Sequence, residues 1–420
     1  MIYRIIVALA LACPLIGVFL MEAGASSQSL SREGHWNYAS LAMAFYVAIF
    51  LIVVVLLSRS RRIIRLGAGQ ESAANSFNPI AIWSLVLLIL MAAFVLFGLG
   101  GFYTLFKTDA AGSFRANLGS GGALGYLILK FYAPAILTNL VLRAPQNSAG
   151  RAIVGISAVL VILVSLSFGY KTAIAIALLP ACIALMWRTN WKAIAIVAAL
   201  SSVVIVVGYL RSPPVNPNDF SLPQLIAYRI FVLNGEVPWK IWDMHMHGET
   251  FPIYSKTLSV IFGDRVYTYF TGVTKADAYT WVMSHFSLMT TYVVGYQPKY
   301  IIEVGHNVSA NAFSEGVILG GLTGVAAIAI LGATITACLY YFIKNRLEAK
   351  DSASASVGVC YFIYGLVAWF LGGGIVSLVH VALMFGVITT FLLLRGINGQ
   401  LRVYPRRDAV VRASSPSQAS

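Results

Sequence analysis

The chain has 420 residues, of which 59% are hydrophobic and only 10% are charged. A water-soluble globular protein is normally about 45–50% apolar and about 25% charged, so this composition excludes that class and requires solvation by lipid. The formal net charge of +14 is divided among many short segments beside apolar runs. This distribution disfavours a nucleic-acid-binding surface and is typical of the cytoplasmic loops of a membrane protein.

Apolar runs with few charges predict about ten membrane-spanning helices, because about 20 apolar residues in a helix cross the hydrocarbon layer. In chain order the expected spans are 3–21, 38–57, 79–105, 120–142, 152–168, 173–187, 193–210, 313–343, 355–374 and 377–394. The first run precedes Ala23-Gly24-Ala25, so a cleaved signal peptide is the alternative to a retained first span. The predicted fold class is an all-α, polytopic integral membrane protein.

These spans divide the chain into four parts. We expect a membrane domain over 1–210 with seven spans, a large loop over 211–311, a second membrane domain over 312–394 with three spans, and a disordered basic tail over 395–420. Placing the amino terminus in the cytoplasm puts most Lys and Arg residues on that side and the large loop on the opposite side.

Two apolar segments of the large loop, 225–233 and 280–294, predict helices that lie on or dip into the membrane. A full crossing by the second segment would turn every later basic loop outward. We therefore reject that crossing.

The densest group of polar residues at a span lies at the start of 313–343, where His306, Asn307, Asn311 and Glu315 follow one another. A carboxylate buried in hydrocarbon is costly, so Glu315 is expected to face a polar cavity or a partner. The structural alternative is that His306 and Asn307 cap the helix while Glu315 pairs with Lys130, the basic residue near the middle of the fourth span.

Several cations break the rule that basic residues lie inside, because the topology places them on the outer face: Arg115, Lys171, Arg211, Arg229 and Arg265. A cation retained there suggests an anionic ligand such as a phosphate. Snorkelling to lipid phosphate explains any one of them equally well. Arg229 is the best single candidate, because the surrounding segment 225–231 is apolar.

The motif His245-Met246-His247-Gly248-Glu249 could ligate a metal, but it lacks a third ligand at a known spacing. The sequence also lacks a P-loop, a dinucleotide fingerprint and a G-x-S-x-G elbow. We predict no metal and no cofactor. An ATP-driven pump and a soluble-type hydrolase are disfavoured.

Three short segments carry a resemblance to a known family. They are Gly305-His306-Asn307 with Glu315-Gly316 and 320–324, the turn Ser167-Phe168-Gly169-Tyr170-Lys171-Thr172, and Arg115 ahead of the Gly-rich 119–125. Together with the layout of spans and loop, they resemble the bacterial oligosaccharide repeat-unit polymerases of the O-antigen polymerase (Wzy) type, which are related in layout to the O-antigen ligases.

That resemblance implies glycosyl transfer between undecaprenyl-diphosphate-linked oligosaccharides at the periplasmic face of the bacterial inner membrane. His306 would be the catalytic base and Glu315 would orient it or the acceptor. The diphosphate would be bound by Arg229, Lys171, Arg115, Arg211 and Arg265, and the acceptor sugar by Asn307, Asn311 and Tyr170.

Aromatic side chains such as Tyr267, Tyr269, Trp281 and Tyr292 could stack on sugar rings or anchor the loop at the membrane interface. The resemblance also implies a chain-length regulator and a flippase as partners, and no nucleic acid. The alternatives are an O-antigen ligase, a flippase or secondary transporter for lipid-linked oligosaccharides, and a receptor or scaffold without chemistry.

Overall fold

The described part of the chain is almost entirely helical. The computed structural model describes residues 2–27, 30, 32–59, 77–106, 114, 118, 121–145, 147–168, 173–188, 221–249, 251, 264–283, 286–304 and 310–399. Eight helices in these ranges are long and apolar enough to cross a membrane. The prediction of an all-α, multi-pass membrane protein is confirmed. The count of about ten spans stays a prediction, since the expected span 193–210 lies outside the described residues.

The long helices agree with most of the predicted spans. They are α1 (Ile2–Glu22), α2 (Ala39–Arg59), α3 with η1 (Phe77–Ala93, Phe94–Gly98), α6 with η2 and α7 (Gly122–Leu127, Ile128–Tyr132, Ala133–Arg143), α8 (Ser148–Ser167), α18 (Ala312–Glu348), α19 with η4 and α20 (Ser352–Tyr361, Phe362–Val367, Ala368–Gly372), and η5 with α21 (Ile375–Val379, Val381–Ile397). The shorter α4 (Phe102–Phe106) and α9 (Ala173–Arg188) accompany them.

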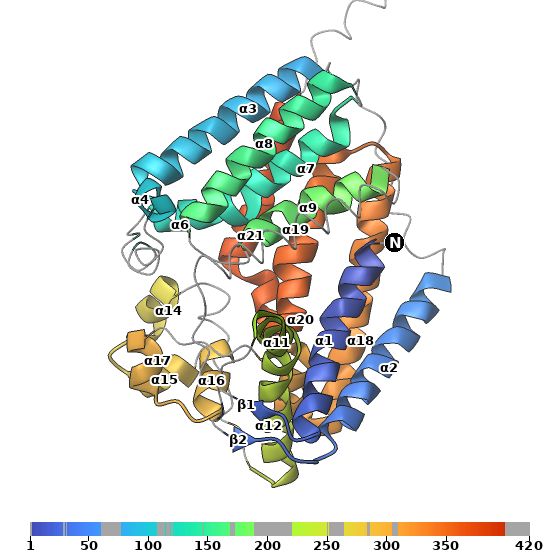
Figure 1. Ribbon diagram of the computed structural model, residues 1–420, viewed down its shortest axis with the longest axis vertical. Coiled ribbons are helices and arrows are strands. Elements are labelled where there is room, and N and C mark those ends of the chain that lie inside the picture. The colour runs from blue at the N-terminus through green and yellow to red at the C-terminus, as the bar shows by residue number, and fades with distance from the viewer. Residues whose placement is uncertain are drawn as a thin grey trace, which may run out of the picture.

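The helices form two groups with separate apolar cores (Figure 1). One core joins α1, α2, α18 and a further helix, α12 (Leu233–Met246). The other joins α3, α7, α8, α9 and α21, and α19 with its continuation connects the two. Large apolar side chains such as Leu56, Trp83 and Phe385 are exposed on the outer faces, as expected for helices that contact lipid.

The segment 225–233 is helical as predicted, but the helix is longer than expected. This segment belongs to one continuous helix made of α11 (Leu222–Ala227), η3 (Tyr228–Val232) and α12. The helix packs along α1 and against α18, and its place relative to the membrane surface stays a prediction. Its polar residues are buried because residues far away in the sequence supply their hydrogen bonds, as shown below, and apolar periodicity cannot reveal such partners.

The predicted span 313–343 also differs, because α18 is folded back on itself. The backbone leaves helical geometry at Gly320 and Gly321, and Gly321 has φ +58°, which favours glycine. A Cβ on Gly316 would lie 2.7 Å from the Cα of Val325, so the short arm 312–319 packs against the start of the long arm 322–348. Only the long arm continues across the helix bundle.

Among the described residues, the rest of the large loop has four short helices: α14 (Asp264–Thr271), α15 (Ala278–Met283), α16 (Phe286–Val293) and α17 (Pro298–Val304). They lie together beside the lower end of the bundle, next to α11 and α12 (Figure 1). α15 has 6 residues and α16 has 8, which are too few to cross hydrocarbon at 1.5 Å per residue. The prediction that 280–294 does not span the membrane is therefore consistent with these short helices.

Candidate functional site

The structure describes the side chains of three sequence-predicted site residues: Arg229, Asn311 and Glu315. Arg265 belongs to α14, but its side chain lies outside the description. The other predicted positions also lie outside the described residues: Arg115, Tyr170, Lys171, Arg211, His306 and Asn307. Their assignments stay predictions.

Glu315 is fully buried and hydrogen-bonded at a break in another helix. Its carboxylate accepts a hydrogen bond from Trp369 Nε1 at 2.9 Å, and from the backbone N–H of Ile375 at 2.8 and 3.0 Å. Ile375 begins η5, directly after the chain leaves α20 at Gly373 and Gly374. The carboxylate thus ties the short arm of α18 to this break, where it satisfies an N–H at a helix start.

Lys130, the predicted alternative partner of Glu315, is not one of the residues that the structure shows in contact with its carboxylate. Lys130 lies on η2, is exposed, and holds its ammonium 5.9 Å from the ring centre of Tyr126. Glu315 instead obtains its hydrogen bonds from Trp369 and Ile375. The sequence correctly marked Glu315 as a residue with a buried polar partner, and two of its hydrogen-bond donors are the neutral N–H groups of Trp369 and Ile375.

Asn311 caps the same short arm. Its Oδ1 accepts from the backbone N–H and the hydroxyl of Ser314, both at 2.9 Å. Its Nδ2 is buried and has no hydrogen-bond partner among the described residues, and the same holds for the hydroxyl of Tyr46, which lies edge-on to Phe313. Buried donors are normally satisfied, and these two atoms are among several exceptions in the described part of the chain.

Arg229 lies on η3, a π-helical turn, and its side chain is half-buried. π-Turns inside α-helices are frequent at functional sites. On the same helix the fully buried Glu236 accepts hydrogen bonds from the hydroxyls of Ser27 at 2.5 Å and Tyr228 at 3.5 Å. Burial, followed by the charge of Glu236, raises the pKa of the Tyr296 phenol, so the loop segment before α17 lies close to this helix.

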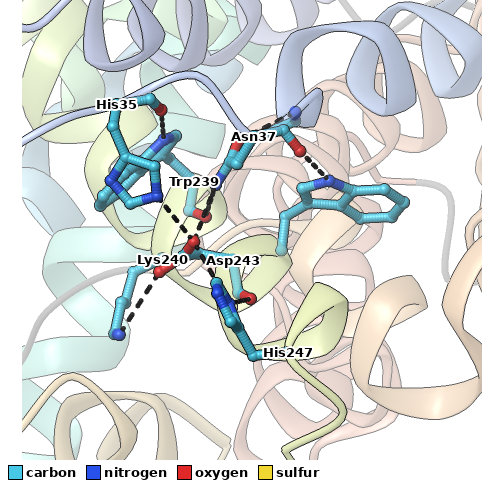
Figure 2. Close-up of polar contacts among 8 residues, drawn as sticks. His35, Asn37, Trp239, Lys240, Asp243 and His247 are labelled. Atoms are coloured by element: carbon cyan, nitrogen blue, oxygen red, sulfur yellow. Dashed lines mark hydrogen bonds and ion pairs between the residues drawn. The ribbon is translucent and has the colours of Figure 1, made fainter.

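A second polar group surrounds Asp243, which is 4% exposed. We call His35, Asn37, Lys240, Asp243 and His247 the Asp243 cluster. The carboxylate lies 3.1 Å from His35 Nε2, 3.5 Å from Asn37 Nδ2, 3.7 Å from Lys240 Nζ and 3.6 Å from His247 Nδ1. Figure 2 shows that the chain segment before α2, which carries His35 and Asn37, meets the end of α12 at this carboxylate.

Two tryptophans hold this arrangement in place. Trp239 Nε1 donates to the backbone oxygen of His35 at 3.0 Å, and Trp242 Nε1 donates to that of Asn37 at 2.9 Å. Both indole rings are buried. The backbone of the segment before α2 is therefore fixed to α12 at two successive points.

The Asp243 cluster and the short arm of α18 lie side by side. The ring of Trp242 packs 6.2 Å from that of Phe313, which is two residues before Glu315. His245 packs on Trp242 and against the turn at Gly321. A common boundary between the Asp243 cluster and the short arm of α18 is therefore formed by Trp242, Phe313 and Gly321.

Sequence reasoning missed His35, Asn37 and Asp243. It noted only His245 and His247, as a weak metal motif, whereas these two rings have different neighbours: His247 Nδ1 donates to the backbone oxygen of Asp243 at 2.7 Å, and His245 faces Gly321. The one signal available was a polar stretch, 34–37, directly before an apolar span. Nothing in it pointed to a partner more than two hundred residues away.

No family model, curated protein or solved structure matches this chain.

Proposed function

We propose that this protein polymerises undecaprenyl-diphosphate-linked oligosaccharide repeat units into a surface polysaccharide, at the periplasmic face of the bacterial inner membrane. The observation that supports it best is the short arm of α18. It follows the segment 305–309 that carries the resemblance, is fixed by Glu315, and contains the buried Asn311 Nδ2, which has no hydrogen-bond partner among the described residues. A rigid helix start with free polar atoms suits the binding of a sugar hydroxyl.

The reaction requires little covalent chemistry from the protein. The acceptor hydroxyl replaces the lipid diphosphate on the donor sugar, so orientation and stabilisation of the leaving anion supply most of the rate. Arg229, with Lys171, Arg115, Arg211 and Arg265, is proposed for the diphosphate. His306 is the base suggested by the sequence, and Asn307, Asn311 and Tyr170 are proposed for the acceptor.

Glu315 acts in this proposal as a positioning residue. Both carboxylate oxygens already accept hydrogen bonds, from Trp369 and Ile375, so the group holds the arm and does not serve as a mobile proton carrier. The proposal includes no metal or other cofactor.

The described aromatic residues of the large loop divide into two classes, and the side chain of Tyr267 lies outside the description. Tyr269 is 84% exposed and Tyr279 is 55% exposed, and both are available for stacking on sugar rings. Trp281 is only 4% exposed and serves the loop core. Tyr292 is half-buried and packs edge-on against Tyr279.

Gene deletion with complementation tests the proposed function. We expect the deletion strain to show single repeat units in place of long surface chains, and to accumulate the repeat unit on its lipid carrier at the outer face. His306→Ala should fail to restore long chains at normal protein level. His380→Asn, which keeps the helix cap that His380 gives α21, is the matched control. Long chains in the deletion strain would refute the proposal.

A second candidate is a flippase or secondary transporter for the same lipid-linked oligosaccharide. It is favoured by the two helix interruptions, at Gly320–Gly321 and at Gly373–Gly374, because interrupted helices commonly line transport sites. In that case the deletion strain would retain the repeat unit on the cytoplasmic side. An O-antigen ligase would instead leave long chains on the lipid carrier. We propose as partners a chain-length regulator and a separate flippase.

A further inference from the structure

The Asp243 cluster contains a histidine in the arrangement of a general base. His35 Nε2 lies 3.1 Å from Asp243 Oδ1, and a carboxylate accepts hydrogen bonds only. The proton of a neutral His35 ring is thereby held on Nε2. Its lone pair is left on Nδ1, which has no hydrogen bond within the described part of the chain. An imidazole oriented by a buried carboxylate, with the other nitrogen free, is the arrangement that activates hydroxyl groups in many enzymes.

Other groups already contact the Asp243 carboxylate, so His35 is not needed to satisfy it. Lys240 lies 3.7 Å from Asp243 Oδ2 and supplies a full positive charge, and Asn37 donates to Oδ1. His247 Nδ1 is already used by a backbone oxygen, and this side chain is 67% exposed. His35 therefore adds a half-exposed ring, 52% accessible, to a carboxylate that already has a cationic and an amide partner.

Two exposed aromatic residues next to His35 in the chain offer a surface on which a sugar could stack. Trp36 and Tyr38 are 53% and 55% exposed and pack edge-on at 5.9 Å. They directly precede α2, whose first turn begins at Ala39. Exposed aromatic rings at the end of a membrane helix lie at headgroup level, which is also the level of the first sugars on a lipid diphosphate carrier. Such rings bind sugar faces by stacking.

We propose that His35, positioned by Asp243, is the general base that activates the acceptor hydroxyl. This inference rests on the proposed glycosyl transfer. The hydroxyl oxygen forms the new bond to the anomeric carbon of the donor, and the bond from that carbon to the diphosphate breaks. The lipid diphosphate leaves with the electron pair. The hydroxyl proton passes to His35 Nδ1, Asp243 stabilises the resulting imidazolium, and the ring later releases the proton to water. His306 then has another role.

Elongation in membrane vesicles tests this assignment. The deletion strain supplies a lipid extract that carries the unprocessed repeat unit, and vesicles with each variant are mixed with it. His35→Gln keeps an amide donor toward Asp243 but cannot accept the proton, so we expect the elongation rate to fall by about 10²-fold or more. His35→Ala should fall equally and be partly restored by added imidazole. His380→Asn should elongate at the wild-type rate.

The role of Asp243 has a readout that does not depend on turnover. ¹⁵N NMR of histidine-labelled protein should show His35 with its proton on Nε2 in the wild type, and a mixture of both tautomers in Asp243→Asn. A His35→Gln variant with more than half of the wild-type rate would overturn the inference and leave the polymerase proposal intact. Loss of elongation in His306→Ala together with normal elongation in His35→Gln would also overturn the inference and leave the polymerase proposal intact. A deletion strain that keeps long chains would overturn both.

Discussion

Glu315 can remain inside the protein because three hydrogen bonds reach its two oxygens. Two of them come from a backbone N–H at the start of η5, where a helix has donors without internal partners. The third comes from the indole of Trp369, which is itself buried. The carboxylate therefore joins two interrupted helices, and both of its oxygens accept hydrogen bonds.

Glu315→Gln should destabilise the protein. An amide nitrogen in place of one carboxylate oxygen would face a donor, so one hydrogen bond is lost and one N–H group is left unpaired. We expect a loss of about 1–3 kcal/mol, measured as the free energy of unfolding in detergent, together with reduced polysaccharide length in cells. Trp369→Phe removes one donor and keeps an aromatic ring beside Phe370. Because the indole is fully buried, the smaller ring also leaves a cavity, so this variant should be destabilised as well. An unchanged unfolding free energy in both variants would contradict this role.

The candidate site was only partly predictable at this scale. Glu315 and Asn311 were found because polar residues at the start of an apolar run are conspicuous. Asp243 was not found, because a single aspartate in a mixed polar segment gives no local signal. Its partner His35 is 208 positions away, and only the packing of α12 against the segment before α2 brings the two together.

At the scale of elements, the length of the apolar runs predicted well where helices form. It predicted poorly where a helix is interrupted. The predicted spans 38–57 and 152–168 correspond to α2 and α8 within a few residues, because an unbroken apolar run has one reasonable structure in lipid. The span 313–343 conceals a turn at Gly320 and Gly321. Glycine is also common in straight membrane helices, so hydropathy alone does not distinguish the two uses.

The contact of α1 with the helix 222–246 depends on small residues, which the sequence pattern did not reveal. A Cβ on Gly17 would lie 2.0 Å from the backbone oxygen of Phe231, and Gly235 faces Gly17 from the other side. Backbones approach this closely only where side chains are absent. This contact aligns α12 so that Trp239 and Asp243 reach the segment before α2.

Gly17→Ala should therefore separate these helices. Backbone atoms cannot move aside as a side chain can, so we expect overpacking to cost about 1–3 kcal/mol, measured by thermal unfolding in detergent. Gly155→Ala is the matched control, because a Cβ at this helical glycine of α8 meets nothing within 4 Å. It should be neutral or slightly stabilising. Equal unfolding midpoints for the two variants would show that the close contact contributes nothing.

At the scale of the whole molecule, arginine side chains from the ends of three helices lie close together. Asp351, between α18 and α19, pairs with Arg346 at 3.8 Å and Arg395 at 3.1 Å, and Arg143 donates to the neighbouring Ser352 at 2.6 Å. These arginines end α18, α21 and α7. These three arginines thus gather at one end of the described bundle, and we propose that this end is cytoplasmic.

The loop helices and the Asp243 cluster lie at the end of the bundle away from these arginines (Figure 1), so single cysteines at the two ends should differ in accessibility. In a background without Cys13, Cys182, Cys338 and Cys360, Lys299→Cys on α17 should react with a membrane-impermeant maleimide on intact spheroplasts. Glu348→Cys at the end of α18 should react only after permeabilisation. Both native side chains are more than half exposed, so burial would not mask the result. The reverse pattern would place His35 and Asp243 in the cytoplasm, where a reaction on periplasmic lipid-linked sugars cannot occur.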